Sequence, residues 1–226
     1  IAIINSSSNI AVCFSHLDAI AKFAAEEIYK AGGISFEIRT AAPADFIFTG
    51  HNGGFVQASR DLIANDIEAA VEGASLDGIL CLASCDKTLP GQLMAAARIN
   101  IPTIVVPCGY QPCGTYKGEH FDIEDLFQQL GHYAMGKVTD SEMEEMSRAA
   151  IKGPGVCQGL GTANSMHIAC EALGFALPGT TPVLANSRKM WDAVAAASKR
   201  IVEMVNEDIK PRDLLTPGAF QNCVKT

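Results

Sequence analysis

Residues 78–107, GILCLASCDKTLPGQLMAAARINIPTIVVP, contain an apolar run, a helical pattern and a second apolar run in succession. The runs GILCLA at 78–83 and TIVVP at 103–107 have the length and composition of buried strands, and residues 89–98 between them have the pattern of a helix. Two strands joined by a helix of this length form a parallel βαβ unit. We therefore predict a parallel sheet in this part of the chain.

The same alternation extends outward from this unit. Residues 1–5 and 34–40 are predicted strands, and residues 17–31, 60–72 and 123–135 are predicted helices. Beyond residue 138 the pattern is helical, with helices expected at 140–150, 162–173 and 188–207. This order predicts an α/β fold of three layers, in which helices cover a mainly parallel sheet. We expect residues 1–226 to form one such domain, with a helical second part from about residue 138.

The composition of the chain excludes several classes of function. The chain has 226 residues, of which 48% are hydrophobic and 19% charged, so it can bury a large core. Its net charge of −8, without a basic run, argues against a nucleic-acid partner. No apolar stretch approaches the roughly 20 residues that cross a bilayer, so we expect no membrane partner and a cytoplasmic location. The chain opens inside a predicted strand, and Thr216 and Pro217 begin a helix near its last residue, so we expect the natural protein to continue.

The eight cysteines are expected to be reduced, because disulfide frameworks belong to small secreted domains. Three of them lie in apolar runs and are predicted to be buried: Cys81, Cys108 and Cys170. Cys113 and Cys223 have no neighbouring group that decides their role. The remaining three cysteines are the candidates for chemistry.

These three cysteines stand in polar loops: Cys13, Cys85 and Cys157. Thiolates select iron–sulfur clusters, zinc or copper, whereas carboxylates prefer magnesium, manganese or calcium. Asp86 and Lys87 directly follow Cys85, so ligands of both kinds are adjacent and suggest two metals side by side. A capped turn with a solvated lysine is the simpler alternative. We expect these three loops and the loop around Asp45 to meet at one edge of the sheet, where ligands bind in open α/β folds.

One other loop, one histidine and the glycine-rich loop around Cys157 provide weaker candidates. Residues 39–55, RTAAPADFIFTGHNGGF, contain Asp45 and His51, and His16 is expected to cap a helix or form a hydrogen bond rather than bind a metal. Residues 152–167, KGPGVCQGLGTANSMH, are glycine-rich and enter a helix near Thr162, where backbone N–H groups could hold a substrate carboxylate. A tight turn is the commoner use of such glycines.

At these residues the sequence resembles the dihydroxy-acid and sugar-acid dehydratase family. The resemblance covers nearly the whole chain, and the order of its CDK and TAN blocks is highly specific. It rests on TGHNG at 49–53, SRDLIANDIE at 59–68, CDKTLPGQLMAAARINIPTI at 85–104, CQGLGTANSM at 157–166, EALGFALPG at 171–179 and PRDLLTPGAFQN at 211–222.

The resemblance implies an iron–sulfur cluster, 2Fe–2S or 4Fe–4S, held by Cys13, Cys85 and Cys157. It also implies a Mg²⁺ site at Asp45, Asp86 and Lys87, with the lysine carbamylated in members that have a two-iron cluster. Lys87 is accordingly the candidate catalytic residue, and Thr162 and Asn164 of the TAN block are the candidate substrate-binding residues. The implied assembly is a homodimer or homotetramer.

The implied reaction is the loss of water from a 2,3-dihydroxy acid, either a branched-chain dihydroxy acid or a sugar acid, to give a 2-keto acid. Family members have more than twice this length, and their C-terminal domain, absent from this chain, supplies the serine base and a further acidic magnesium ligand. We therefore expect the isolated chain to be inactive. Phe14 and Phe46 depart from the residues usual in the family and hint at a divergent substrate.

Two alternatives stay open beside a hydro-lyase. The chain could be a non-catalytic fragment or paralogue that retains the fold as a binding or assembly domain. It could also be a zinc-binding α/β module that uses the same cysteines, although structural zinc sites usually have paired ligands at CxxC-like spacing.

Overall fold

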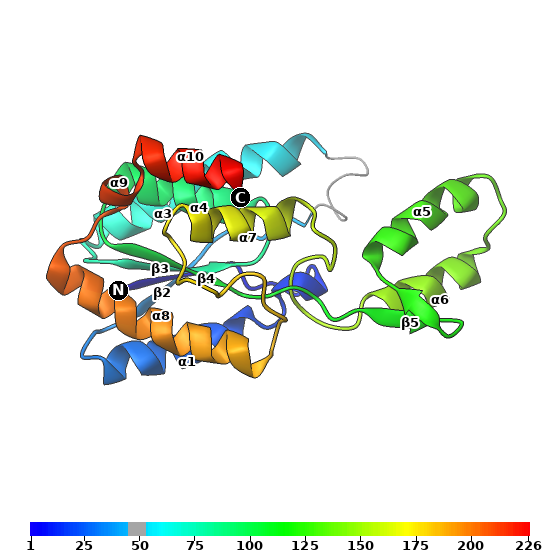
Figure 1. The fold of residues 1–226 in the computed structure, drawn as a ribbon, viewed down its shortest axis with the longest axis horizontal. Coiled ribbons are helices and arrows are strands. Elements are labelled where there is room, and N and C mark those ends of the chain that lie inside the picture. The colour runs from blue at the N-terminus through cyan, green and yellow to red at the C-terminus, as the bar shows by residue number, and fades with distance from the viewer. Residues whose placement is uncertain (45–52) are drawn as a thin grey trace.

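The computed structural model describes residues 1–44 and 53–226. Its centre is a four-stranded parallel sheet of order β2-β1-β3-β4. The strands are β1 (Ala2–Asn5), β2 (Phe36–Arg39), β3 (Ile79–Ala83) and β4 (Thr103–Pro107). In the register, Ile3 is paired with Leu80, and Leu80 with Ile104. Helices cover both faces of this sheet, so the predicted α/β fold is confirmed (Figure 1).

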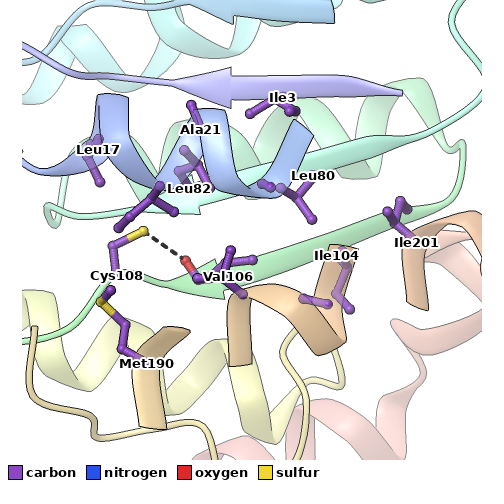
Figure 2. Close-up of a cluster of buried hydrophobic side chains, with 14 of the residues drawn as sticks. Ile3, Leu17, Ala21, Leu80, Leu82, Ile104, Val106, Cys108, Met190 and Ile201 are labelled. Atoms are coloured by element: carbon purple, nitrogen blue, oxygen red, sulfur yellow. Dashed lines mark hydrogen bonds between the residues drawn. The ribbon is translucent and has the colours of Figure 1, made fainter. Parts of the chain in front are cut away.

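One face of the sheet is covered by α1 (Leu17–Lys30) and α8 (Arg188–Glu207). Side chains alternate across a strand, so every second residue of β3 and β4 faces these two helices: Leu80, Leu82, Ile104 and Val106. Figure 2 shows these side chains with those that meet them from the helices, namely Leu17, Ala21, Met190 and Ile201. The helices predicted at 17–31 and 188–207 are therefore present and supply the core on this face.

The opposite face is covered by α3 (Gly54–Gly73) and α4 (Thr88–Ile99), together with Cys170 of α7 (Thr162–Ala172). Gly91 lets α3 and α4 approach closely, because a Cβ there would lie 2.9 Å from the carbonyl oxygen of Arg60. The helix predicted at 60–72 begins earlier than expected, at Gly54. The prediction started too late because the two glycines at 53 and 54 are typical of a loop. All three cysteines predicted to be buried are at most 1% exposed: Cys81, Cys108 and Cys170.

Residues 114–150 form a small lobe that projects to one side of the sheet (Figure 1). The lobe consists of an antiparallel hairpin, β5 (Gly114–Tyr116) and β6 (Glu119–Phe121), and two helices, α5 (Ile123–Ala134) and α6 (Asp140–Ala150). Its core has five buried residues: Phe121, Leu126, Met146, Ala149 and Ala150. The sequence predicted both helices but missed the hairpin, because each strand has only three residues and little hydrophobic alternation.

The chain ends in two short helices, α9 (Pro211–Leu214) and α10 (Pro217–Lys225). The hydroxyl oxygen of Thr216 accepts a hydrogen bond from the backbone N–H of Ala219 at 3.2 Å, so the predicted N-cap is confirmed. In the parts of the chain that the structure describes, no helix combines the length and the apolar character needed to span a membrane.

The carboxyl ends of the strands form the edge that carries the candidate site. The chain passes from β1 through α1 to β2 on one side of β1, whereas β3 lies on the other side, so the winding reverses between β1 and β3. Such a reversal opens a crevice beyond the strand ends, where ligands bind in open α/β sheets. Cys13 follows β1 in the short 3-10 helix η1 (Val12–Phe14), and Cys85 follows β3.

Candidate active site at the carboxyl edge of the sheet

A cavity of about 480 Å³ lies at this edge. Three segments that are far apart in the sequence contribute a cysteine to its lining: Cys13, Cys85 and Cys157. Asp86 and Thr162 line the same cavity, so the predicted convergence of these loops is present in the structure. Much of the remaining lining is apolar and includes Ile10, Val12, Ile123 and Phe127.

The backbone carbonyl of Cys13 links the three cysteine segments. It accepts a hydrogen bond from the hydroxyl of Ser84 at 3.1 Å and one from the backbone N–H of Gly155 at 3.4 Å. Ser84 directly precedes Cys85, and Gly155 lies two residues before Cys157. These two bonds fix the relative positions of the three cysteine-bearing segments.

Cys85 lies between the end of β3 and the first turn of α4. Its backbone N–H donates to the Thr88 hydroxyl at 3.0 Å, and its thiol donates to Asp86 Oδ1 at 3.3 Å. Burial raises the pKa of the Cys85 thiol well above its usual range, and the neighbouring Asp86 and Cys13 raise this pKa further. A bound cation would reverse this preference, because metal ligation requires the thiolate.

Asp86 and Lys87 form a buried ion pair beside this cysteine. Lys87 Nζ lies 2.6 Å from Asp86 Oδ2, and the two residues are only 3% and 8% exposed, respectively. The carbonyl of Asp86 accepts a hydrogen bond from Arg60 at 3.1 Å, which ties this turn to α3. The solvated lysine of the capped-turn alternative is therefore not what the structure shows. A charged pair buried in this way is costly to desolvate, so it is weak evidence for a purely stabilising role.

The loop that carries Cys157 is held against the end of β4. Val156 forms a parallel bridge with Tyr110, and the side-chain amide of Asn164 donates to the carbonyls of Cys157 and Gly159, both at 2.8 Å. Gly155 has φ +108°, and a Cβ there would lie 2.7 Å from the carbonyl oxygen of Gly109. Only glycine combines this backbone conformation with so close an approach.

Comparison with known proteins assigns the family. The N-terminal domain family of dihydroxy-acid/6-phosphogluconate dehydratases matches residues 1–226. The chain belongs to this family. Among its relatives, dihydroxy-acid dehydratases of Methanothermobacter thermautotrophicus, Methanobrevibacter smithii and Halothermothrix orenii are 40%, 39% and 38% identical over 225 residues. Each alignment covers 99% of this chain and 41% of the relative, so the chain spans about two fifths of the length of these dehydratases.

The remaining candidate residues of this dehydratase-family chain have different positions. Lys87 and Asn164 are not among the described residues that line the cavity. Lys87 instead forms an ion pair with Asp86, which does line it, and Asn164 holds the loop of Cys157. His16 occupies the N-cap position of α1 without capping it through its side chain, and its Nε2 instead lies 2.7 Å from the carbonyl oxygen of Cys108. Asp45 and His51 lie outside the described residues.

Two polar residues of the cavity, Gln111 and Glu124, were missed in the sequence. Gln111 is 4% exposed and lines the cavity, and its Oε1 has no hydrogen-bond partner among the described residues. It lies in the loop after β4, as Cys85 lies after β3, so its position at a carboxyl strand end was the available signal. The lobe residue Glu124 also lines the cavity. It gave no such signal, because it does not directly follow a strand of the main sheet.

Proposed function

We propose that the full-length protein is a hydro-lyase that removes water from a 2,3-dihydroxy carboxylic acid to give a 2-keto acid. The observation that carries this proposal is that Cys13, Cys85 and Cys157 share one cavity with Asp86, at the edge where the winding of the sheet reverses. Membership of the dehydratase family and the relatives named dihydroxy-acid dehydratase support the same activity. The substrate is either a branched-chain dihydroxy acid or a sugar acid.

The cysteine set fits an iron–sulfur cluster, because thiolates are the usual ligands of iron in such clusters. Three cysteines, rather than four, would leave one iron position open. When bound, the cluster would supply a Lewis acid for a substrate hydroxyl. The hydrogen bonds from Ser84 and Gly155 to the Cys13 carbonyl join the three cysteine segments, and Asn164 further holds the loop of Cys157.

The carboxylate of Asp86 fits a hard cation such as Mg²⁺, and Lys87 fits only if its amine is modified. An ammonium group 2.6 Å from the carboxylate would repel a divalent ion at this position. A carbamate would convert Lys87 into an anionic oxygen ligand, and burial favours the deprotonated amine from which a carbamate forms. Asp45 would complete the magnesium ligands of this chain.

The chain's own residues would bind and orient the acid. Backbone N–H groups in the first turn of α7, beginning at Thr162, are suited to a substrate carboxylate because the positive end of the helix dipole lies there. The unpartnered amide oxygen of Gln111 can accept a hydrogen bond from a substrate hydroxyl. Apolar residues from η1 and the lobe would limit water in the same space. Assembly as a homodimer or homotetramer stays a prediction.

Replacement of single cysteines in the full-length protein tests the cluster. After anaerobic reconstitution, Cys13→Ser, Cys85→Ser and Cys157→Ser should each lose most bound iron and more than about 100-fold in turnover, because even outer-shell changes at metal sites cost 10–100-fold. Iron and sulfide analysis, with turnover of dihydroxyisovalerate and of a sugar acid, provides the measurement. Cys223→Ser is the matched control and should behave as wild type. Zinc without iron in the reconstituted wild type would contradict the proposal.

Lys87→Arg in the full-length protein tests the magnesium site separately. Arginine retains the positive charge but forms no stable carbamate, so bound magnesium and turnover should both fall more than about 100-fold. Iron content should stay at the wild-type level, because the cysteines are unchanged. The exposed Lys22→Arg serves as control. Near-normal turnover of Lys87→Arg would remove Lys87 from the proposed site while leaving the cluster proposal intact.

A further inference from the structure

The β5–β6 hairpin of the small lobe, together with the residues that directly flank its strands, carries a cysteine, a histidine and an aspartate on one face. The hairpin pairs Gly114 with Phe121 and Thr115 with His120, so continuing this register places Cys113 opposite Asp122. Cross-strand partners point to the same face of a hairpin, as do residues two apart in one strand. Cys113, His120 and Asp122 therefore project to the same side, although Cys113 and His120 are seven positions apart in the sequence.

The packing of the hairpin fixes which side this is. Phe121 and Tyr116 pack in or against the core of the lobe, and a Cβ on Gly114 would collide with the carbonyl oxygen of Ala149 in α6. That face is therefore held against α6. The opposite face is open to solvent, and Cys113 and His120 are both exposed on it.

The three ligand atoms already lie close together. Cys113 Sγ and one ligand atom each from His120 and Asp122 are all within 4.8 Å of one another. His120 Nε2 lies 3.2 Å from Asp122 Oδ2, close to the edge of about 3.3 Å expected for two ligands bound tetrahedrally at bond lengths near 2.0 Å. The Cys113 thiol is exposed and lies within 4.8 Å of both other ligand atoms.

Asp122 is also oriented for ligation. As the N-cap of α5, its Oδ1 accepts hydrogen bonds from the backbone N–H groups of Glu124 at 2.8 Å and Asp125 at 3.2 Å. These bonds leave Oδ2 directed toward His120. Partners of this kind fix the orientation of metal ligands in proteins. An exposed histidine–carboxylate ion pair contributes little to stability. Such a pair also does not explain why a cysteine lies on the same face.

We propose that Cys113, His120 and Asp122 bind one Zn²⁺ ion, with water as the fourth ligand. A thiolate, an imidazole and a carboxylate together suit zinc, whereas magnesium and calcium prefer oxygen ligands alone. The ion would join the hairpin to the first turn of α5. The next residues, Ile123 and Glu124, line the main cavity, so the ion would stabilise the lobe wall of that cavity. This inference does not depend on the proposed dehydratase activity.

Zinc titration of the full-length, cluster-loaded protein against a chromophoric chelator tests the proposal. The wild-type protein should bind one Zn²⁺ per chain at this site. Each of the variants Cys113→Ser, His120→Gln and Asp122→Asn should bind this ion at least about 10-fold more weakly. Asparagine is as good an N-cap as aspartate, so Asp122→Asn retains the start of α5. Cys223→Ser and His132→Gln are the matched controls and should bind zinc as wild type does.

Cobalt gives a second measurement that does not depend on zinc affinity. Co²⁺ bound at this site should show a thiolate-to-cobalt charge-transfer band that Cys113→Ser abolishes and Cys85→Ser leaves unchanged. The proposal is overturned if the zinc affinity of Cys113→Ser and His120→Gln equals that of the controls. It is also overturned if the cobalt band is lost in Cys85→Ser but retained in Cys113→Ser, because the metal would then occupy the main cavity.

Discussion

The sheet body, residues 1–44, 53–113 and 151–226, and the small lobe, residues 114–150, line the same cavity but have very different cores. In the body, two large clusters of buried residues lie on the two faces of the sheet. The lobe is supported by one cluster of five buried residues. Because burial of apolar area supplies most of the stability of a fold, the body should be far harder to open than the lobe.

The body and the lobe also contribute different kinds of residues to the cavity. Its cysteines, Asp86 and Thr162 come from the body, whereas Ile123, Glu124 and Phe127 come from α5 of the lobe. Reactive ligands need fixed geometry, which the body provides. The part of the cavity wall that α5 forms can move more easily, because the core of the lobe is small. Local interactions such as the capping boxes at the starts of α5 and α6 therefore contribute more to the order of these helices.

The largest expected effect concerns Gly109, which lies in the body where the chain leads from β4 toward the lobe. Gly109 follows β4 with φ +87°, and a Cβ there would lie 2.5 Å from the backbone nitrogen of Ala185. Gly109→Ala should lower the free energy of unfolding by about 3 kcal/mol, from the left-handed backbone and the overpacking together. It should also reduce bound iron, because the loop of Cys157 packs against Gly109 through Gly155. Urea unfolding and iron analysis of the full-length protein provide the measurements.

The hairpin of the lobe supplies a matched control for this change. Gly118 also has φ +87°, but a Cβ there would meet nothing within 4 Å. Gly118→Ala should therefore lower stability by only about 1 kcal/mol, the contribution of the backbone conformation alone. Equal effects of the two substitutions would show that the turn at Gly109 tolerates a side chain and that the body is less rigid than its packing indicates.

The sequence predicted the body better than the lobe for a physical reason. Apolar runs such as residues 79–83 and 103–107 are buried on both faces, so their composition alone indicates parallel strands. The hairpin strands of the lobe have three residues each and bury only one face. Their pairing depends on contact with α6, which no local pattern records.

The candidate site shows the same division. The convergence of Cys13, Cys85 and Cys157 was predictable because each lies in a loop at the carboxyl edge of the sheet. The bonds that position them, from Ser84 and Gly155 to the carbonyl of Cys13, were not predictable. They join residues about 70 and 140 positions apart, and common residue types such as serine and glycine give no sign of such a partner.

A smaller effect should distinguish the histidines of the two regions. His167 on α7 is 3% exposed, and burial lowers its pKa to about 4, whereas His120 and His132 of the lobe are exposed. With an unfolded pKa near 6.5, the unfolded chain binds the proton more readily, so His167 contributes stability above pH 6.5 that is lost as the pH falls toward 4. At pH 5 the loss from this residue should be about 2 kcal/mol relative to pH 7.

Urea unfolding of the full-length protein at pH 7 and pH 5 measures this difference. His167→Gln removes the titrating group, so the free energy of unfolding should fall by about 2 kcal/mol less on acidification than in wild type, whatever the variant's stability at pH 7. His132→Gln, at an exposed position, is the matched control and should show the wild-type difference between the two pH values. Identical pH dependence in wild type and His167→Gln would mean that water or a hydrogen-bond partner reaches His167 Nε2, and that the body is open to solvent at α7.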